Sequence, residues 1–592
     1  MSIERKAMEQ DRKKFYSLII IAIVLFVVAF SLSVNVPPQQ LEQYSFNGGD
    51  LSITPSVLYV HNFLWYSPSA FASVTLKSVQ SVVQVSVTEV NSTHLSVFNR
   101  TFHNVSYFSF YFGLHPNKSF QTENFFVTIG SQIITVSIAI KSSPLPLIGE
   151  LSLLSSFILF LTGIYLAPFK SRLWIIPIAV SFLVLSAFLG HRFDMFFMIT
   201  GGFHILSGAN PFIQSHNIPG ELKWTYPPYY LIWSVIADWL SGTITHTAIP
   251  TSHSLIFPGL SFNYYEAWLA FVPRSLPVYY LLAKLPMVVS VLAIYYILLK
   301  KFNLPYNLTK IWLLSPFVML IGVIWGQLDI IASVFLLLSV FYFQKGRSDL
   351  AVLASVLGFW IKIFPIFIFP LILIESKNRM RDLGIAVLSS LPALFIYLYT
   401  GNFVKDLETL VYSRSTNTFN GVFNAQGLTW QIIVSKLGIV HFPSIFLFTF
   451  LPFLVIISIV YYFRRGNIVN YIIVEFMFFF LTYNFVDPQY FIVLIPLFLI
   501  NRDLWNYVVF SVYPFLFILL TYSFTYFITP SLSLSYFTSF LGQQEALRTW
   551  ITSSNLFILP LVTAFTLSVI TTILMVVRKR KFRLVWRAIF AK

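Results

Sequence analysis

Four ionisable residues of this sequence stand where an apolar segment ends or breaks. Asp194 comes directly after an apolar segment, in His191-Arg192-Phe193-Asp194. Asp329, Lys362 and Asp487 each stand at a break between two short apolar segments. If these segments cross a membrane, each ionisable side chain is expensive there and is a candidate for function. A carboxylate can act as a general base on a hydroxyl group, and a lysine can bind a phosphate as a point charge.

Amides and aromatic side chains accompany these residues. Gln327 precedes Asp329, and Gln489 and Tyr490 follow Asp487. Amides hydrogen-bond hydroxyl groups, and aromatic rings stack on the faces of sugars. The set therefore predicts a cleft for a sugar that is attached to a lipid phosphate.

Each candidate also has a purely structural interpretation. Asp194 could be a polar residue at a helix end, and Lys362 could extend to the membrane interface from a short helix. Asp329 and Asp487 could each cap a helix. Glu475, inside an apolar segment, could hydrogen-bond a neighbouring helix.

Metal and nucleotide chemistry have little support. His191 and His204 lie near Asp194 in the sequence, but no set of His, Asp and Glu residues has metal-site spacing. We therefore expect no metal and no other cofactor. The chain has no Gly-rich phosphate loop, which argues against a nucleotide-sugar donor on a Rossmann domain.

The composition predicts a membrane protein. Of the 592 residues, 57% are hydrophobic, 18% are aromatic and only 10% are charged. A soluble globular protein is near a quarter charged, so a soluble enzyme is excluded. The net charge of +16 comes from short basic runs between apolar stretches, which argues against a nucleic-acid partner. There are no cysteines, which excludes disulfides and thiol catalysis.

The apolar segments predict a polytopic α-helical membrane protein with about 14 transmembrane helices. The first covers residues 15–34, too long an apolar stretch for a signal peptide. Several others are shorter than the roughly 20 residues that a span needs. The short ones come in pairs hinged at residues 325–329, 362–365 and 487–489, and irregular backbone at membrane depth is tolerated only where it lines a cavity. The further helices are expected near residues 147–168, 172–190, 276–299, 308–324, 328–343, 349–361, 363–375, 383–400, 443–463, 468–484, 489–500, 504–527 and 556–577.

The positive charges predict the orientation. With the N-terminus inside, the inner segments carry 25 of the 38 Lys and Arg residues, including the run 578–581 after the last helix. Both termini are then cytoplasmic, and the polar hinges gather on the outer side. Residues 191–275 become one long outer loop, with residues 226–241 lying along the interface as an amphipathic helix.

Residues 36–145 predict a separate extracytoplasmic domain between residues 1–35 and the transmembrane domain 146–592. Period-2 runs such as 82–87 and 125–140 are typical of a β-sandwich. Four glycosylation sequons fall within this domain, at Asn91, Asn99, Asn104 and Asn117. The alternative is that these Asn residues belong to Ser/Thr-rich strands by chance.

The order of these elements resembles the GT-C superfamily of membrane glycosyltransferases, most of all GPI mannosyltransferase I and its prokaryotic relatives. The likeness covers about residues 170–505. It rests on Asp194 at the start of the long loop, on 208–212 (GANPF), which contains Asn210, and on 225–228 (TYPP), which contains Tyr226. It rests also on 357–365 (LGFWIKIFP) and 487–491 (DPQYF). The single acidic residue of the first loop, where that family has a pair, and the β domain at 36–145 depart from the family's pattern.

The resemblance implies an inverting transfer of a hexose, with mannose favoured, from a polyprenyl-phosphate donor to a lipid-linked glycan or glycolipid at the outer face. Asp194 would be the base. Lys362, and after it Arg414, would stabilise the leaving phosphate. The other candidate substrate-binding residues, from the hinges and from these elements, are Asn210, Tyr226, Gln327, Asp329, Asp487, Gln489 and Tyr490.

Three other functions stay open. A transporter or flippase of lipid-linked sugars would need polar residues along a path to both faces. A non-catalytic subunit would act through the β domain. A protein mannosyltransferase would have an acidic pair in the first loop. The features lean towards an archaeal plasma membrane, and in a eukaryote the same topology would fit the endoplasmic reticulum. The need for a partner subunit also stays open.

Overall fold

The computed structural model describes the helical segments 175–206, 229–245, 276–399, 446–483, 485–522 and 555–578, the strands between residues 42 and 142, and short stretches near residues 17–28, 152–159, 208–212, 224–228 and 418–436. The chain divides into two compact units. Unit 1 comprises Met1–Trp224, Leu231–Leu285 and Thr525–Gly542, and unit 2 comprises Thr225–Tyr230, Pro286–Phe524 and Gln543–Lys592.

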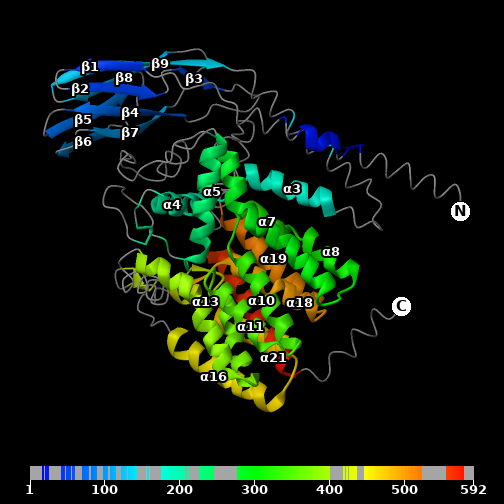
Figure 1. Ribbon diagram of the computed structural model, residues 1–592. Helices are drawn as coiled ribbons and strands as arrows, with labels where there is room; N and C mark the ends of the chain where they lie inside the picture. Colours follow the sequence, from blue (N-terminus) through cyan, green and yellow to red (C-terminus); the bar gives the residue numbers. More distant parts are fainter. Residues whose placement is uncertain are drawn as a thin grey trace, which may run out of the picture. The chain divides into compact units, whose positions relative to one another are not determined.

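Two β-sheets form the N-terminal part of unit 1, as the period-2 runs predict (Figure 1). One sheet has the strand order β1-β2-β4-β7, and the other has the order β3-β9-β8-β5-β6. All neighbours pair antiparallel except β3 and β9. The strands are β1 (Glu42–Phe46), β2 (Gly49–Thr54), β3 (Val57–Val60), β4 (Ala70–Ser78), β5 (Val82–Glu89), β6 (Phe98–His103), β7 (Tyr107–Leu114), β8 (Thr122–Ile129) and β9 (Gln132–Ser142).

The helices of unit 1 include one that the sequence does not predict. α3 (Ile175–Phe188) corresponds to the expected segment 172–190, and α5 (Tyr229–Thr245) to the helix expected at 226–241. α4 (Arg192–Leu206) lies inside the region expected to be a long loop. Its polar residues and its Gly201-Gly202 pair argue against a helix in the sequence, yet the pair is what lets α4 pack. A Cβ on Gly201 would lie 2.8 Å from the Trp224 ring, and one on Gly202 would lie 2.1 Å from the Asp238 carboxylate.

Unit 2 is a helical bundle with breaks at the three predicted hinges. A further break falls at Ser315, where the chain bends by 49° between Tyr306–Leu314 and Pro316–Trp325, so the single helix expected at 308–324 is wrong. The π-helix η2 (Leu320–Trp325) ends at Gly326, which has a left-handed φ of 81°, and α10 (Asp329–Gln344) begins three residues later. α11 (Ser348–Phe359) is followed by the 3₁₀ helix η3 (Phe364–Ile368). α17 (Ile468–Thr482) is followed by strand β13 (Phe485–Val486) and the 3₁₀ helix η4 (Pro488–Val493).

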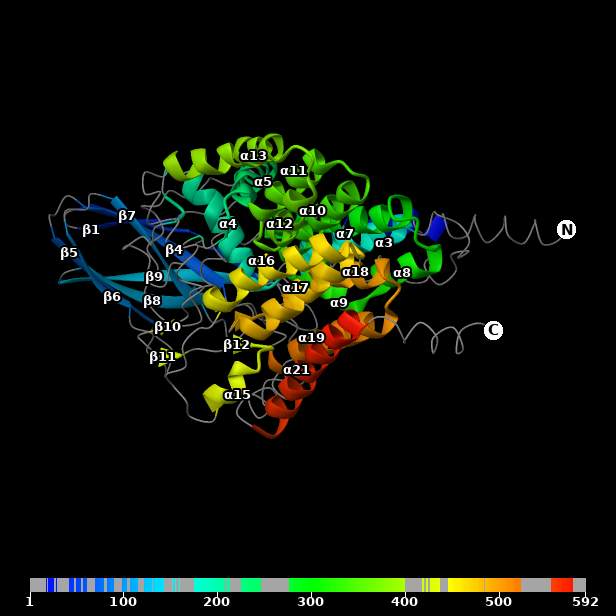
Figure 2. The ribbon, with the colours of Figure 1, turned by 90° about the horizontal axis from the view of Figure 1, so that it is seen from below.

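The other elements of unit 2 complete the bundle. They are α7 (Leu276–Lys300), whose first turns belong to unit 1, α8 (Tyr306–Leu314), α9 (Pro316–Met319), α12 (Phe369–Glu375), α13 (Arg379–Tyr399), β10 (Thr418–Phe419), β11 (Val422–Phe423), β12 (Gln426–Gly427), α15 (Gln431–Lys436), α16 (Phe446–Arg464), α18 (Ile495–Ile500), α19 (Leu504–Thr521) and α21 (Asn555–Arg578). Figure 2 shows α16 and α17 side by side.

Phenylalanine rings fill the bundle around η3. The rings of Phe364 and Phe479 meet edge to face at 5.8 Å, and those of Phe367 and Phe450 at 4.9 Å. Edge-to-face contacts of this kind stabilise a core beyond the area that they bury. Aromatic packing therefore fixes the hinge after α11 against α16 and α17.

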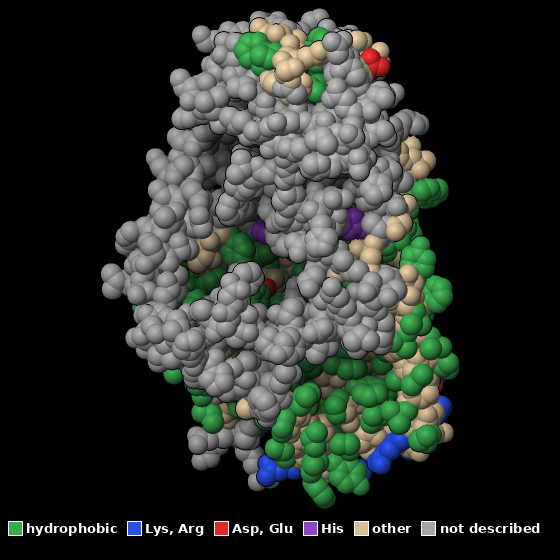
Figure 3. Space-filling model, turned by 90° about the vertical axis from the view of Figure 1, so that its left-hand side faces the viewer, with side chains coloured by type: hydrophobic (Ala, Val, Ile, Leu, Met, Phe, Trp, Pro, Cys, Tyr) green, Lys and Arg blue, Asp and Glu red, His purple; other side chains and the backbone are tan. Residues whose placement is uncertain are grey.

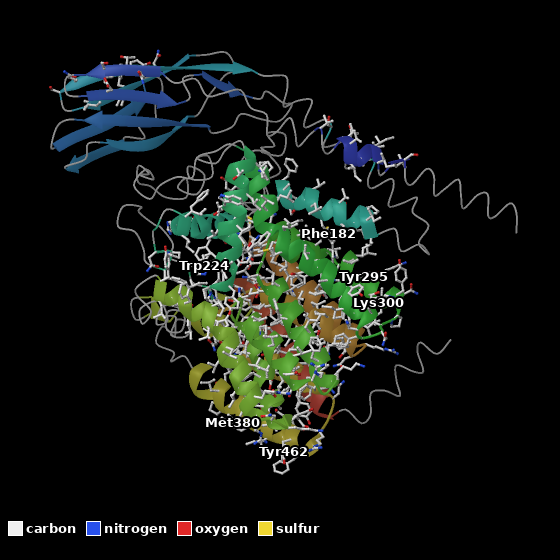
Figure 4. All side chains as sticks on the ribbon, viewed as in Figure 1. Phe182, Trp224, Tyr295, Lys300, Met380 and Tyr462 are labelled. Carbon is white, nitrogen blue, oxygen red and sulfur yellow. The ribbon has the colours of Figure 1, made fainter. Side chains whose placement is uncertain are left out.

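The described helices are compatible with a membrane protein. Three of them are long and apolar enough to cross a bilayer, Pro277–Lys300, Arg379–Tyr399 and Leu504–Thr521, and a bent pair, Tyr306–Leu314 and Pro316–Trp325, could form a fourth span. The expected number of 14 spans, and the topology, stay predictions. Apolar side chains cover the described surface in Figure 3, with Lys and Arg at one end of it. Met380 of α13 and Tyr462 of α16 lie at the same end of unit 2 (Figure 4).

Candidate functional site

In unit 1, Asp194 occupies the first turn of α4 and faces His191. The His191 carbonyl accepts the Met195 N–H at 2.9 Å, so His191 immediately precedes the first helical residue. The His191 Nδ1 atom lies 2.9 Å from the Asp194 Oδ2 atom, and both side chains are about nine-tenths buried. The positive end of the helix dipole also favours a carboxylate at this position. Asp194 is thus part of a buried polar pair.

A buried lysine fixes the link that precedes this pair. Lys284 of α7 donates from Nζ to the Leu189 carbonyl and lies over the Tyr280 ring, 5.6 Å from its centre. A cation is favourable at the C-terminal end of a helix, here α3. A Cβ on Gly190 would lie 2.8 Å from the same Tyr280 ring, so only glycine fits there. Tyr280 and Lys284, one turn apart on α7, therefore hold residues 189–190.

In unit 2, four segments that are far apart in the sequence meet at Lys362. Its Nζ atom lies 3.1 Å from the Asp329 Oδ2 atom, at the start of α10. The same atom lies 4.6 Å from the centre of the Tyr226 ring and 5.3 Å from that of the Tyr490 ring. Both members of the ion pair are buried, with 4% of Lys362 and none of Asp329 exposed. We call Tyr226, Asp329, Lys362 and Tyr490 the Lys362 cluster.

The cluster rules out two of the structural interpretations. Lys362 does not extend to an interface, because it is buried and paired. Asp329 does not cap α10, because the N-cap residue is Leu328 and makes no side-chain cap. Asp487 stands at the N-cap of η4 without a capping hydrogen bond, and its Oδ2 atom accepts from the Gln489 Nε2 atom at 3.1 Å.

The segment that carries Tyr226 is anchored in unit 2. The Tyr229 N–H donates to the Trp360 carbonyl at 3.1 Å, and the Tyr229 hydroxyl donates to the Ser389 carbonyl. The Trp360 Nε1 atom donates to the Ser390 hydroxyl at 2.8 Å. These bonds join residues 225–230 to the hinge after α11, and Lys362 stands in that hinge.

A parallel strand pair positions the segment that carries Tyr490. β12 pairs with β13, and the Leu428 N–H donates to the Val486 carbonyl at 2.8 Å. Gly427 has a φ of 82°, and a Cβ there would lie 2.0 Å from the Val486 carbonyl oxygen. Trp430 and Gln431 donate to the Leu481 and Thr482 carbonyls, at the end of α17. The unwound end of α17 is therefore held by a neighbouring backbone.

The remaining predicted site residues have separate outcomes. Gln327 is buried in the hinge before α10. The Oδ1 atom of Asn210 accepts the Phe212 N–H at 2.8 Å, which forms a local turn in unit 1. Arg414 lies outside the described residues, as do Asn91, Asn104 and Asn117, while Asn99 falls on β6. Asp194 belongs to unit 1 and the Lys362 cluster to unit 2.

Several buried ionisable residues fall outside the predicted roles, among them Lys284, Asp238 and Glu475. The sequence predicts no role for Lys284 or Asp238, because each stands within a segment whose apolar residues already predict a helix. Burial raises the pKa of the Asp238 carboxyl well above its ordinary value. Glu475 is fully buried on α17, and neither of its oxygens has a hydrogen-bond partner among the described residues. The structural interpretation of Glu475, a hydrogen bond to a neighbouring helix, is therefore not found among the described residues.

Each group of residues offers its own chemistry. An aspartate held at a helix N-terminus can accept a proton. An ammonium group has three N–H donors, and Asp329 takes only one of those on Lys362. Among the described residues, no group of three or more His, Asp and Glu side chains could hold a metal ion. The chain matches no protein-family model, and no curated protein matches it significantly.

Proposed function

We propose that this protein is an integral membrane glycosyltransferase of the GT-C type. It transfers a hexose, with mannose favoured, from a polyprenyl-phosphate donor to a lipid-linked glycan or glycolipid on the outer face of the cell membrane. The active site faces outward, and both termini are cytoplasmic.

The convergence of four segments on Lys362 is the observation that carries the proposal. Tyr226, Lys362 and Tyr490 are residues of the sequence elements that resemble that family, and Asp329 belongs to the hinge 325–329. They come from the stretch before α5, from two hinges and from η4, and their side chains meet around one buried ammonium group. A cation is rare and costly inside an apolar protein, which favours a functional interpretation of the cluster.

The proposed reaction is a single displacement with inversion. Asp194 takes the proton of the acceptor hydroxyl as the bond from the acceptor oxygen to the anomeric carbon forms. The bond between that carbon and the phosphate oxygen breaks, and the electron pair leaves with the phosphate. The leaving group needs charge stabilisation more than it needs a proton. Lys362 supplies that charge, with Arg414 as the second candidate.

The pairing of Lys362 with Asp329 refines this role. A phosphate at Lys362 meets an ammonium group whose direction is already fixed by Asp329 and by two aromatic rings. A group held in advance is worth more in the transition state than one that must reorient. Asp329 therefore orients the cation, and the tyrosine rings are suited to the sugar.

Transfer of labelled mannose from polyprenyl-phosphate mannose, in proteoliposomes with a crude glycolipid acceptor pool, tests the proposal. The wild type should transfer the label, and Asp194→Asn should not. Asp349→Asn is the matched control, because Asp349 is a carboxylate paired with Arg347 at the end of α11 opposite to Lys362. Full transfer by Asp194→Asn would remove the base from the proposal. No transfer by the folded wild type from mannose or glucose donors would favour a transporter or flippase of lipid-linked sugars.

A further inference from the structure

The side chain next to Asp194 is a histidine that nothing in the proposed reaction uses. The His191 Nδ1 atom approaches the Asp194 Oδ2 atom to 2.9 Å. This distance is short enough for a hydrogen bond when the ring N–H points at that oxygen. The alignment of this contact can tighten when a substrate is bound.

The backbone of His191 is fixed on both sides. On one side, Lys284 holds the Leu189 carbonyl, and Gly190 packs against Tyr280 with no room for a Cβ. On the other side, the His191 carbonyl accepts the Met195 N–H in the first turn of α4. A side chain on such a fixed backbone can define the position of its neighbour three residues later, which lies on the same side of the helix.

We propose that His191 is a positioning residue for Asp194. Its Nδ1–H group holds the Oδ2 atom of the carboxylate, and this sets the direction of the other oxygen, which receives the proton of the acceptor hydroxyl. The relation reverses that of the Ser-His-Asp triad, in which the aspartate orients the histidine. The inference rests on the proposed function, in which Asp194 is the base.

Two substitutions separate positioning from simple packing. His191→Asn keeps a side-chain N–H donor close to the place of Nδ1, whereas His191→Leu keeps the volume without a donor. We expect His191→Leu to lower kcat by about 10- to 100-fold, because misplacing a reacting group by about 1 Å can cost that much. The KM for the donor should change little, and His191→Asn should restore kcat to within about 3-fold of the wild type.

A buried histidine at the other end of α4 provides the control. His204 lies in the last turn of α4 and is 5% exposed. His204→Leu should leave kcat near that of the wild type. An equal loss of kcat in His191→Leu and His204→Leu would overturn the inference, as would an unchanged kcat in His191→Leu. Equal losses in His191→Asn and His191→Leu would overturn it as well, since positioning needs only the donor.

A spectroscopic measurement tests the contact without any activity. The chain has 10 histidines, so ¹⁵N-histidine labelling yields few ring signals, and the pair from His191 is the one missing in His191→Asn. The Nδ1 signal of His191 should shift in Asp194→Asn, and an unchanged signal would overturn the contact. If the signal differs between the wild type and Asp194→Asn but the wild type transfers no sugar, the contact stands. The proposed function is then overturned, and the role of His191 with it.

Discussion

The Nζ atom of Lys362 and the Oδ2 atom of Asp329 lie 3.1 Å apart in a buried ion pair that joins the hinge after α11 to the start of α10. The two residues are 33 positions apart in the sequence. Removing one partner of such a pair leaves a buried charge without its counterion, which costs far more than removing both. The pair therefore has a structural consequence that can be measured apart from any activity.

Single and double substitutions of this pair should differ in stability. Lys362→Met and Asp329→Leu should each lower the free energy of unfolding by about 3–5 kcal/mol, and the double variant should recover most of that loss. Thermal unfolding of the purified protein in detergent measures the effect. Arg347→Met is the control, because the Arg347–Asp349 pair is exposed and its loss should leave the midpoint unchanged. A double variant as unstable as the sum of the two single variants would contradict the prediction.

Removing the buried carboxyl of Glu475 should stabilise the protein. Both carboxyl oxygens lack a hydrogen-bond partner among the described residues, and such a group costs about 1–3 kcal/mol when buried. Glu475→Leu should therefore raise the thermal midpoint. Glu375→Leu is the control, since Glu375 is partly exposed and lies 3.7 Å from Arg465. A lower midpoint for Glu475→Leu would show that the carboxyl has a partner after all.

Gly427 should tolerate no side chain, because the Val486 carbonyl lies too close to it, in addition to its positive φ. Gly427→Ala must move the Val486 carbonyl, which would lie 2.0 Å from the new Cβ, and this breaks the pairing of β12 with β13. Gly346 has a similar φ of 71° but open space around it. Gly346→Ala should cost only the backbone strain, about 1–2 kcal/mol. Equal midpoints for the two variants, measured by thermal unfolding, would contradict this reasoning.

The predicted topology can be tested directly, because the chain contains no cysteine. Lys345 lies in the exposed turn between α10 and α11, on a segment predicted to be inside, and Ser131 lies in the exposed turn between β8 and β9, predicted to be outside. A membrane-impermeant thiol reagent should label Ser131→Cys in intact cells and Lys345→Cys only after permeabilisation. Labelling of both in intact cells would contradict the orientation.

The sequence predicts well where the helices of unit 2 are interrupted. It predicts poorly which side chains contact one another there. Gly326, Pro365 and Pro488 mark the hinges, because glycine and proline disturb a helix whatever surrounds them. By contrast, no local signal shows that Lys362 meets Asp329 or that Tyr226 lies over its ammonium group. Such contacts depend on how distant segments pack against one another. The spacing of residues along the chain does not show this packing.

Unit 1 shows the opposite limit. α4 is hidden in the sequence by Arg192, Asp194 and its two glycines, although those glycines are what its close packing requires. The role of Lys284 is not predicted, because the other residues of its segment are apolar enough to predict a membrane helix. The two β-sheets are the easiest part to predict, since alternation along a strand is a strong signal over even eight residues.

The anchoring of Tyr229 in unit 2 sets an order of events during biosynthesis. Its hydroxyl binds a carbonyl, that of Ser389, which is made 160 residues later. At a synthesis rate of about 5–20 residues per second, Tyr229 waits roughly 8–32 s for this partner. The start of α5 is therefore made well before its anchor exists, and it can take its final position only after α13 has been made.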